Sequence, residues 1–206
     1  MMYAFFLRLI VFTVLFISVF SGCGITKPSM FYTLNSLNAT EKVKSISPET
    51  RSISIMLNPV DIPDYLDRSN IVTRSSQNKL EISEYHRWGG SLQEDIMRVL
   101  AENLSILLSQ NNVNVIMFKI GVPVDYKMTV DLVRFDIMSD KNVLLKSHWT
   151  VTGKDGKIVV PLQGTELIEK VSGTGYSAQV DAMSHALEKL SREMAEKIES
   201  LIHEAK

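Results

Sequence analysis

The 206-residue chain contains a single cysteine, Cys23, and therefore cannot form an intrachain disulfide. Small secreted domains that lack a sufficient apolar core depend on several such bonds. The chain also lacks an excess of charge of either sign, with 22 Lys and Arg residues against 23 Asp and Glu residues. We therefore expect an ordinary hydrophobic core, and we expect no nucleic acid partner, because the sequence has no basic stripe.

Long hydrophobic runs are scarce, and the one at the N-terminus is short. It extends from Leu9 to Phe20 with two polar interruptions, and Arg8 precedes it. A helix needs about 20 apolar residues to cross a bilayer, so this segment is typical of a secretory signal peptide. We predict that residues 1–22 are a signal peptide.

The cysteine directly follows this segment, in the sequence Phe20-Ser21-Gly22-Cys23-Gly24. Small residues before a cysteine at this point resemble the lipobox of bacterial lipoproteins, in which the peptide is cut before the cysteine and the cysteine is acylated. Several acyl chains anchor a protein stably, whereas one alone is marginal. We predict lipidation at Cys23 and a lipidated tether over residues 23–29. The alternative is a lone apolar cysteine at the end of a signal anchor.

The residue after the cysteine bears on which membrane holds the anchor. In the common bacterial sorting rule, Asp at this position retains a lipoprotein in the inner membrane, whereas this chain has Gly24. We therefore expect a lipid anchor in the outer membrane, on its periplasmic face. The short tether, at roughly 3.4 Å per residue, would keep the folded domain close to that membrane.

Residues 30–206 have the length of one domain and contain eight segments typical of strands. Alternating apolar residues predict a half-buried strand over 52–60. Residues 75–78 and 153–156 have the composition of turns, which predicts antiparallel hairpins around them. The predicted strands cover residues 30–34, 52–60, 70–74, 79–82, 113–118, 127–138, 143–152 and 157–170.

Apolar residues that recur every three to four positions predict two helices. The first is expected from residue 92 to about 110, because Ser91 and Glu94 form a capping box before it. The second is expected from about 177 to 203. The predicted buried positions are Ile96, Leu100, Leu104 and Leu107 in the first helix and Val180, Met183, Leu187, Leu190, Met194, Ile198 and Leu201 in the second.

These elements predict a single α/β domain. A mixed, largely antiparallel β-sheet is expected to pack against two principal α-helices, as in anticodon-binding domains or a similar layered sandwich. The order of strand, helix and strand around the first helix permits one parallel crossover. The charged positions of the second helix lack a sustained heptad pattern, which favours a helix packed across the sheet over a free coiled-coil arm.

Three patterns that could suggest an enzyme or a metal site lack the rest of that site. Residues 173–178 match a dinucleotide-binding turn, but no strand with an acidic end follows the helix. Asp61, Asp64 and Asp67 lack the glycine and glutamate of a calcium-binding loop. The four histidines show no metal-ligand spacing. We therefore predict no catalytic site, no metal and no cofactor.

A block between residues 61 and 88 combines arginine with aromatic residues. Such residues are enriched in protein interfaces, because planar side chains supply contact area and guanidinium groups pair with carboxylates. The alternative is internal, with Trp88 in the core. Arg87 would then pair with Glu84 or Asp67. The interaction candidates are Tyr65, Asp67, Arg68, Arg74, Tyr85, Arg87 and Trp88, and the proline in the block predicts exposed loops.

This ordered block resembles the ABC-type transport auxiliary lipoproteins, the family of paraquat-inducible protein C. The resemblance extends from Cys23 to the last helix. The residues that carry it are Phe31-Tyr32-Thr33-Leu34, Asp61-Ile62-Pro63-Asp64-Tyr65-Leu66-Asp67-Arg68, Ile71-Val72-Thr73-Arg74, Asn78-Lys79-Leu80, Glu84-Tyr85-His86-Arg87-Trp88 and a stretch of the last helix at residues 186–195.

The resemblance implies a lipoprotein that works with an MCE-domain protein and its membrane partners in moving lipids between the envelope membranes. It would be a non-catalytic accessory component that contributes to envelope integrity, and the absence of a Walker motif agrees with that role. A homo-oligomer that presents the domain to its MCE partner is a further expectation. The alternative is a chaperone or plug for outer-membrane assembly. A periplasmic hydrolase is a third hypothesis, without an identifiable nucleophile and base.

Overall fold

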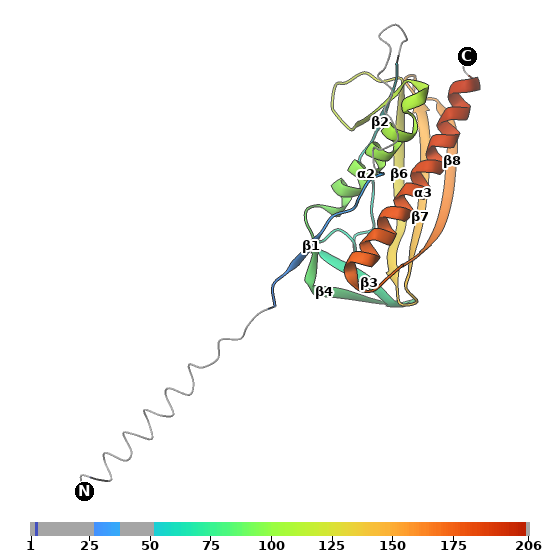
Figure 1. The fold of residues 1–206 in the computed structure, drawn as a ribbon. Helices are drawn as coiled ribbons and strands as arrows, with labels where there is room; N and C mark the ends of the chain where they lie inside the picture. Colours follow the sequence, from blue (N-terminus) through green and yellow to red (C-terminus); the bar gives the residue numbers. More distant parts are fainter. Residues whose placement is uncertain (1–2, 4–26, 38–51, 205–206) are drawn as a thin grey trace.

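The computed structural model describes residue 3, residues 27–37 and residues 52–204. The predicted lipidation site Cys23 and, apart from Tyr3, the predicted signal peptide lie outside these residues. Within them, one mixed sheet of eight strands packs against two helices, which confirms the predicted fold class (Figure 1). The elements are β1 (Met30–Tyr32), β2 (Ile53–Leu57), β3 (Asn70–Ser76), β4 (Lys79–Trp88), α2 (Leu92–Leu107), the 3-10 turn η1 (Ser109–Asn111), β5 (Val113–Met117), β6 (Tyr126–Met138), β7 (Asn142–Gly153), β8 (Ile158–Lys170) and α3 (Gly175–Glu204).

Strand β6 is the centre of the sheet. One of its edges pairs antiparallel with β7, which pairs in turn with β8. Its other edge pairs in parallel with β2 near its start, for example Leu57 with Met128, and with β3 near its end, as in Arg74 with Met138. Beyond β2 lies β5, and beyond β3 lie β4 and β1. The sheet therefore has two arms on one side of β6, which we name the β5 arm (β2 and β5) and the β1 arm (β3, β4 and β1).

The linker between the arms, residues 58–69, also follows the edge of β6. Strand β2 ends at Leu57, earlier than predicted, and Pro59 has no N–H to continue a ladder. The backbone N–H of Asp61 then donates to the carbonyl of Val130 at 3.1 Å, and the N–H of Leu132 donates to the carbonyl of Asp61 at 2.8 Å. The linker is thereby held against the sheet before it enters β3.

Helix α2 begins where the capping residues predict. The Ser91 side chain accepts a hydrogen bond from the N–H of Glu94 at 3.3 Å. The helix ends earlier than predicted, because η1 tightens the last turn and Asn112, with a φ of 58°, turns the chain into β5. Strand β5 lies parallel to β2. The parallel crossover that the sequence permits, between the strands directly before and after α2, is therefore not formed, because β5 pairs with β2 while β4 belongs to the other arm.

Helix α3 buries the predicted stripe with one exception. Its side chains from Val180 to Ile198 on that stripe are buried, but Leu201 is half-buried and Ile202 is buried instead. Residues three and four positions after Ile198 lie near the same helix face. A spacing of three to four residues therefore does not predict which of Leu201 and Ile202 is buried.

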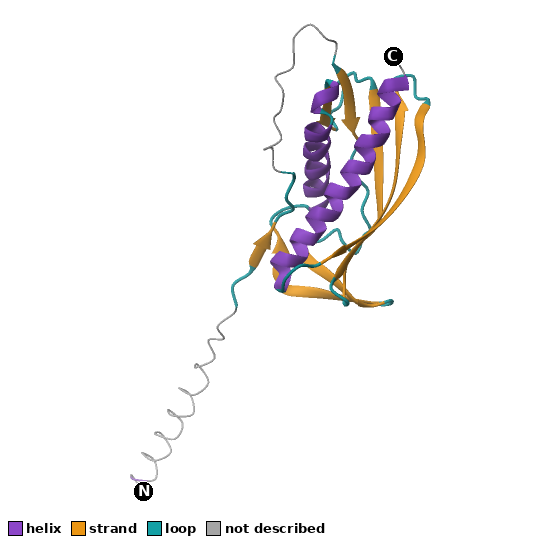
Figure 2. Cartoon of the chain, turned by 45° about the vertical axis from the view of Figure 1, so that its right-hand side comes forward, coloured by secondary structure: helices purple, strands orange, loops and turns teal. Residues whose placement is uncertain are grey.

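The two helices lie side by side over one face of the sheet (Figure 2). The Thr165 hydroxyl in β8 donates to Oε2 of Glu193 in α3 at 2.8 Å, so this side of β8 faces the helix. Side chains of a strand alternate between faces, and Ile168 accordingly lies on the face that the helices leave uncovered, where it is 65% exposed. The largest fully buried side chains include Trp149 and Phe135 of the central strands.

Strand β4 is longer than predicted. The sequence predicts its end at Ile82, but it continues to Trp88, because β1 pairs in parallel with its last three residues. The partners are Met30 with His86, Phe31 with Arg87 and Tyr32 with Trp88. Residues 84–88 therefore lie in a strand, and Arg74 lies in β3, within the strand predicted over residues 70–74.

Candidate functional site

Tyr65 and Arg74 meet at a buried carboxylate, Asp136, that the sequence analysis did not single out. The Tyr65 hydroxyl donates to Oδ1 of Asp136 at 2.7 Å, and Nε of Arg74 donates to Oδ2 at 2.8 Å. Arg134 donates to Oδ2 through its own Nε at 2.7 Å. Only 2% of the Asp136 side chain is exposed. These three partners therefore replace the hydrogen bonds that water would otherwise give the carboxylate.

The sequence contains one local signal for this cluster. Asp136 lies in β6 between Phe135 and Ile137, which are both buried. An acidic residue within a buried strand requires a partner, because charged side chains are almost never fully buried unless they are paired. The signal predicts that a partner exists. It does not identify Tyr65 and Arg74, which reach Asp136 only because the linker and β3 follow the edge of β6.

The environment of Tyr65 keeps its hydroxyl protonated. Burial, followed by the hydrogen bond to Asp136 and the negative charge of that carboxylate, raises the pKa of Tyr65 from 10.0 to about 12. The guanidinium of Arg74, 5.5 Å from the centre of the tyrosine ring, opposes this shift but does not cancel it. Arg74 also donates to the carbonyl of Gln77 at 3.0 Å. Tyr65 and Arg74 are thus bound within the molecule, which favours a structural role for both.

The interaction candidates in β4 differ in burial. Trp88 is 5% exposed, so the structural alternative holds for this residue. Nε of Arg87 is buried, and among the described residues it has no hydrogen-bond partner, so the ion pair with Glu84 or Asp67 is not formed there. Tyr85 is half-buried, and a hydrogen bond to Glu84 raises its pKa above the usual 10.0.

Asp67 and Arg68 are the two candidates whose side chains are exposed. They lie in a turn before β3 that backbone hydrogen bonds define. The N–H of Leu66 donates to the carbonyl of Pro63 at 2.8 Å, and the N–H of Arg68 donates to the carbonyl of Leu66 at 2.8 Å. In the described ranges, neither side chain forms an ion pair. This exposed turn, residues 67–68, therefore remains available to a binding partner.

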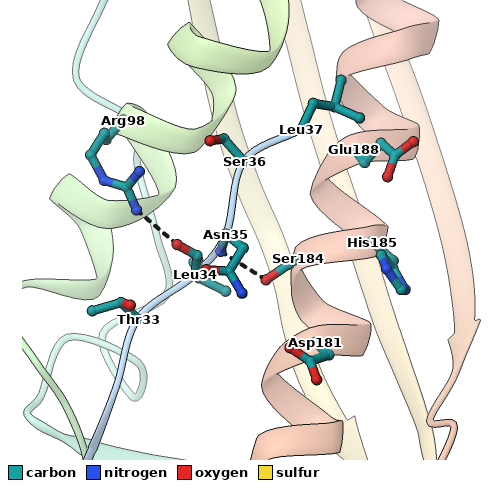
Figure 3. A pocket seen from close by; sticks show the side chains of 10 residues that line it. All are labelled: Thr33, Leu34, Asn35, Ser36, Leu37, Arg98, Asp181, Ser184, His185 and Glu188. Atoms are coloured by element: carbon teal, nitrogen blue, oxygen red, sulfur yellow. Dashed lines mark hydrogen bonds between the residues drawn. The ribbon is translucent and has the colours of Figure 1, made fainter. Parts of the chain in front are cut away.

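A second polar site lies between the two helices, where the segment that follows β1 crosses α2 (Figure 3). The N–H of Leu34 donates to Oδ2 of Asp95 at 2.6 Å, and its carbonyl accepts from Nη2 of Arg98 at 2.8 Å. Both partners belong to α2. The side chain of Leu34 is buried, so this segment, residues 33–37, combines an apolar contact with a fixed backbone.

The same segment is bonded to α3. The N–H of Asn35 donates to Oγ of Ser184 at 3.0 Å. The N–H of Leu37 donates to Oδ1 of Asn103 at 2.7 Å, and Nδ2 of this fully buried asparagine donates to Oγ of Ser191 in α3 at 3.2 Å. Polar side chains in the interface between α2 and α3 therefore bind residues 33–37. These hydrogen bonds explain why Asn103, Ser184 and Ser191 occur among the apolar residues of the buried helix faces.

A cavity of about 850 Å³ opens beside residues 33–37. Its walls include Arg98 of α2 and Asp181, His185 and Glu188 of α3 (Figure 3). These groups can bind a polar ligand through charges of both signs. Among residues 3, 27–37 and 52–204, no group of three His, Cys, Asp or Glu side chains is placed to hold a metal ion.

The glycine-rich turn before α3 has a conformational explanation. Gly173 and Gly175 have φ values of 119° and 80°, which disfavour other residues. A Cβ on Gly173 would also lie 3.2 Å from the Cβ of Ala178. The glycines are thus required for the turn that leads into α3.

Solved structures share this fold. A crystal structure of an uncharacterized protein aligns with a TM-score of 0.70 and 20% identity, covering 84% of this chain and 99% of that chain. Protein XCC0632 from Xanthomonas campestris aligns with a TM-score of 0.62 and 14% identity, covering 81% and 93% respectively. At such identities the likeness shows the fold alone. No curated protein gives a significant match to this sequence.

The family assignment comes from the sequence itself. The profile of the ABC-type transport auxiliary lipoprotein component family matches residues 32–195. This match spans the residues that line the cavity, the exposed turn, the Asp136 cluster and most of α3. It confirms the resemblance found in the sequence. No helix in the part of the chain that the structure describes has both the length and the hydrophobicity to cross a bilayer. The chain belongs to the ABC-type transport auxiliary lipoprotein family.

Proposed function

We propose that this protein is a non-catalytic accessory lipoprotein of an MCE-type system that moves lipids between the envelope membranes and contributes to envelope integrity. Acylated Cys23 anchors it in the outer membrane, and the domain faces the periplasm. The single observation that carries the proposal is the family match over residues 32–195. The signal segment and Gly24 support the route to the outer membrane.

The exposed turn supports a role in protein binding. Its backbone is fixed by hydrogen bonds, and the neighbouring Tyr65 is fixed by Asp136. A surface that is ordered before binding loses less conformational entropy when a partner binds. We assign Asp67 and Arg68 to an interface, formed between copies of this chain, that presents the domain to the MCE-domain partner.

Charge reversal tests this interface. Arg68→Glu should leave the thermal midpoint nearly unchanged, because the side chain is exposed, yet weaken assembly by about 2 to 5 kcal/mol through loss of a paired charge. Oligomer size and partner recovery from crosslinked envelopes measure the effect. Lys154→Glu, at an exposed turn between β7 and β8, is the matched control. Unfolding of Arg68→Glu would establish an internal role, and unchanged assembly would remove the turn from the interface.

The anchor is tested separately from the interface. Cys23→Ser should abolish labelling with palmitate and cause the precursor to accumulate. Labelling that survives the substitution would contradict lipidation at Cys23. Fractionation of the wild-type protein should recover it with the outer membrane, and recovery with the inner membrane would contradict the sorting inferred from Gly24 while leaving the lipid anchor in place.

The partner is tested by crosslinking in native envelopes. Purification of the full-length lipoprotein should recover an MCE-domain protein and its associated membrane proteins. Recovery of outer-membrane assembly proteins instead would contradict the transport role and favour a chaperone or plug.

A further inference from the structure

Strand β1 presents two large apolar side chains to solvent. Met30 is 56% exposed and Phe31 is 66% exposed. Consecutive side chains of a strand point to opposite sides, so apolar surface lies on both sides of this short strand. Within the described residues β1 pairs with β4 alone. These side chains therefore project from the edge of the sheet instead of closing a core.

This edge is also where the chain leads to the predicted lipid. Figure 1 shows β1, β4 and the start of α3 at one end of the domain and the C-terminus at the other. Residues 24–29 separate Cys23 from Met30, and an extended chain spans at most about 3.6 Å per residue. Met30 therefore lies within about 25 Å of the cysteine, whatever path the tether takes.

Strand β1 is held firmly to the rest of the domain. The hydroxyl of Tyr32 and Nδ1 of His86 share a hydrogen bond of 2.7 Å, and the ring of His86 stacks on Tyr176 of α3 with ring centres 3.8 Å apart. The carbonyl of Tyr32 accepts from the N–H of Gly89 at 2.8 Å. Met30 and Phe31 are consequently displayed on a rigid support.

The surroundings fit a lipid surface better than a protein. Two projecting side chains are far fewer than the 20 to 30 residues a side, roughly, of a stable protein interface. Lys27, three residues before Met30, is exposed, and long cationic side chains can keep their charged ends among lipid headgroups while their stems contact apolar surface. Glu84 within β4 and Arg68 before β3 add exposed charges of both signs, so binding should not depend on anionic lipid.

We propose that Met30 and Phe31 insert into the interfacial layer of the bilayer that holds the lipid anchor. The inference rests on the proposed acylation of Cys23, which keeps the bilayer within reach and so at high effective concentration. The β1 end then docks on the membrane, and the end with the C-terminus faces away from it.

The test uses the full-length lipoprotein in phosphatidylcholine vesicles. Since Cys23 is acylated, a cysteine introduced elsewhere is the sole free thiol for a polarity-sensitive fluorophore. Phe31→Cys carries the probe, and Met30→Cys repeats the measurement with Phe31 present. The matched control is Ile120→Cys, because Ile120 is 87% exposed and apolar and belongs to the segment between β5 and β6. This segment lies away from the β1 end (Figure 1).

The label at position 31 should shift its emission to shorter wavelength and lose about half of its intensity to a quencher attached to lipid, as expected for a group about 5 to 10 Å below the surface. The label at position 120 should do neither. Proteoliposomes that float while position 31 stays in water would overturn membrane docking and leave the anchor intact. Protection of position 31 from aqueous iodide without quenching by lipid would overturn docking in favour of a protein contact. Protein that fails to float would overturn the anchor and this inference together.

Discussion

The two arms of the sheet start from the same central strand but are stabilised differently. In the β5 arm, Leu57 and Val113 are buried, and α2 packs against β5. The β1 arm exposes Met30, Phe31 and Ile82, while the main helix contacts are with β5, β6, β7 and β8. This arm also buries Ile71, Val72 and Trp88 in the core, and Arg74 binds Asp136 of β6. The covered arm therefore packs its apolar side chains under a helix, whereas the outward arm combines apolar burial with polar contacts.

The largest effect is expected under the covered arm. Leu104 of α2 is fully buried, so Leu104→Ala should lower the free energy of unfolding by about 2 to 5 kcal/mol through lost apolar burial and a cavity. Urea unfolding of residues 29–206, which we expect to fold without signal peptide or lipid, measures it. Leu107→Ala, at a half-buried position, should cost less. A loss below about 1 kcal/mol at Leu104 would contradict the assigned helix face.

A comparable but smaller effect is expected where the β1 arm joins β6. Asp136→Ala leaves Arg74 and Arg134 without their shared carboxylate. Removing one partner of a buried ion pair costs about 3 to 5 kcal/mol, and we expect about 3 kcal/mol because both arginines keep some contact with water. Asp67→Ala in the exposed turn should change stability by less than about 0.5 kcal/mol. Equal losses at the two aspartates would show that the polar cluster does not position this arm.

The connection between β1 and the helices should show a moderate effect. Asn103→Ala removes the acceptor for the N–H of Leu37 and the donor to Ser191. Loss of a buried hydrogen-bonding group typically costs about 1 to 3 kcal/mol. Ser105→Ala, on the same helix but bonded to the carbonyl of Ala101, is the control and should be nearly neutral. A neutral Asn103→Ala would mean that residues 33–37 are held by Leu34 alone.

The smallest effect is a change in pH dependence. The pKa of Tyr65 is raised to about 12 in the folded protein, so its contribution to stability is complete below pH 10 and is lost as the pH rises through about 12. In Tyr65→Phe, the fall in unfolding free energy between pH 10 and 12 should therefore be shallower than in the wild type. Parallel curves from chemical unfolding at each pH would show that the folded environment does not raise this pKa.

Local patterns predicted the elements that local interactions define. The capping residue Ser91 indicated the start of α2, and the apolar spacing indicated its buried face at Leu100 and Leu104. The prediction of burial is wrong for Leu107, which is half-buried in the last turn of the helix. The glycine turn at residues 153–156 gave the β7–β8 hairpin. Each of these features depends on residues that are close in the sequence, so they can be read without knowledge of the fold.

The features that the sequence did not predict depend on distant partners. Strand β4 continues past Ile82 because β1 supplies a second edge for residues 86–88. Asp136 gains Tyr65 and Arg74 from segments more than sixty positions away. Sequence alone places the interaction candidates in one group, and the structure divides them. Trp88 is buried, and Tyr65 and Arg74 are hydrogen-bonded to Asp136. Asp67 and Arg68 are the two candidates with exposed side chains.

The position of residues 33–37 between α2 and α3 has a mechanical consequence. Tension on the N-terminus acts along β1. The hydrogen bonds between β1 and β4 are then loaded together in shear. Bonds that are loaded together resist a force better than bonds that are loaded one after another. Past β1, the bonds of Leu34, Asn35 and Leu37 pass the force to both helices. A pull on the N-terminus is thus spread through the helical layer, and the turn that carries Arg68 is bypassed.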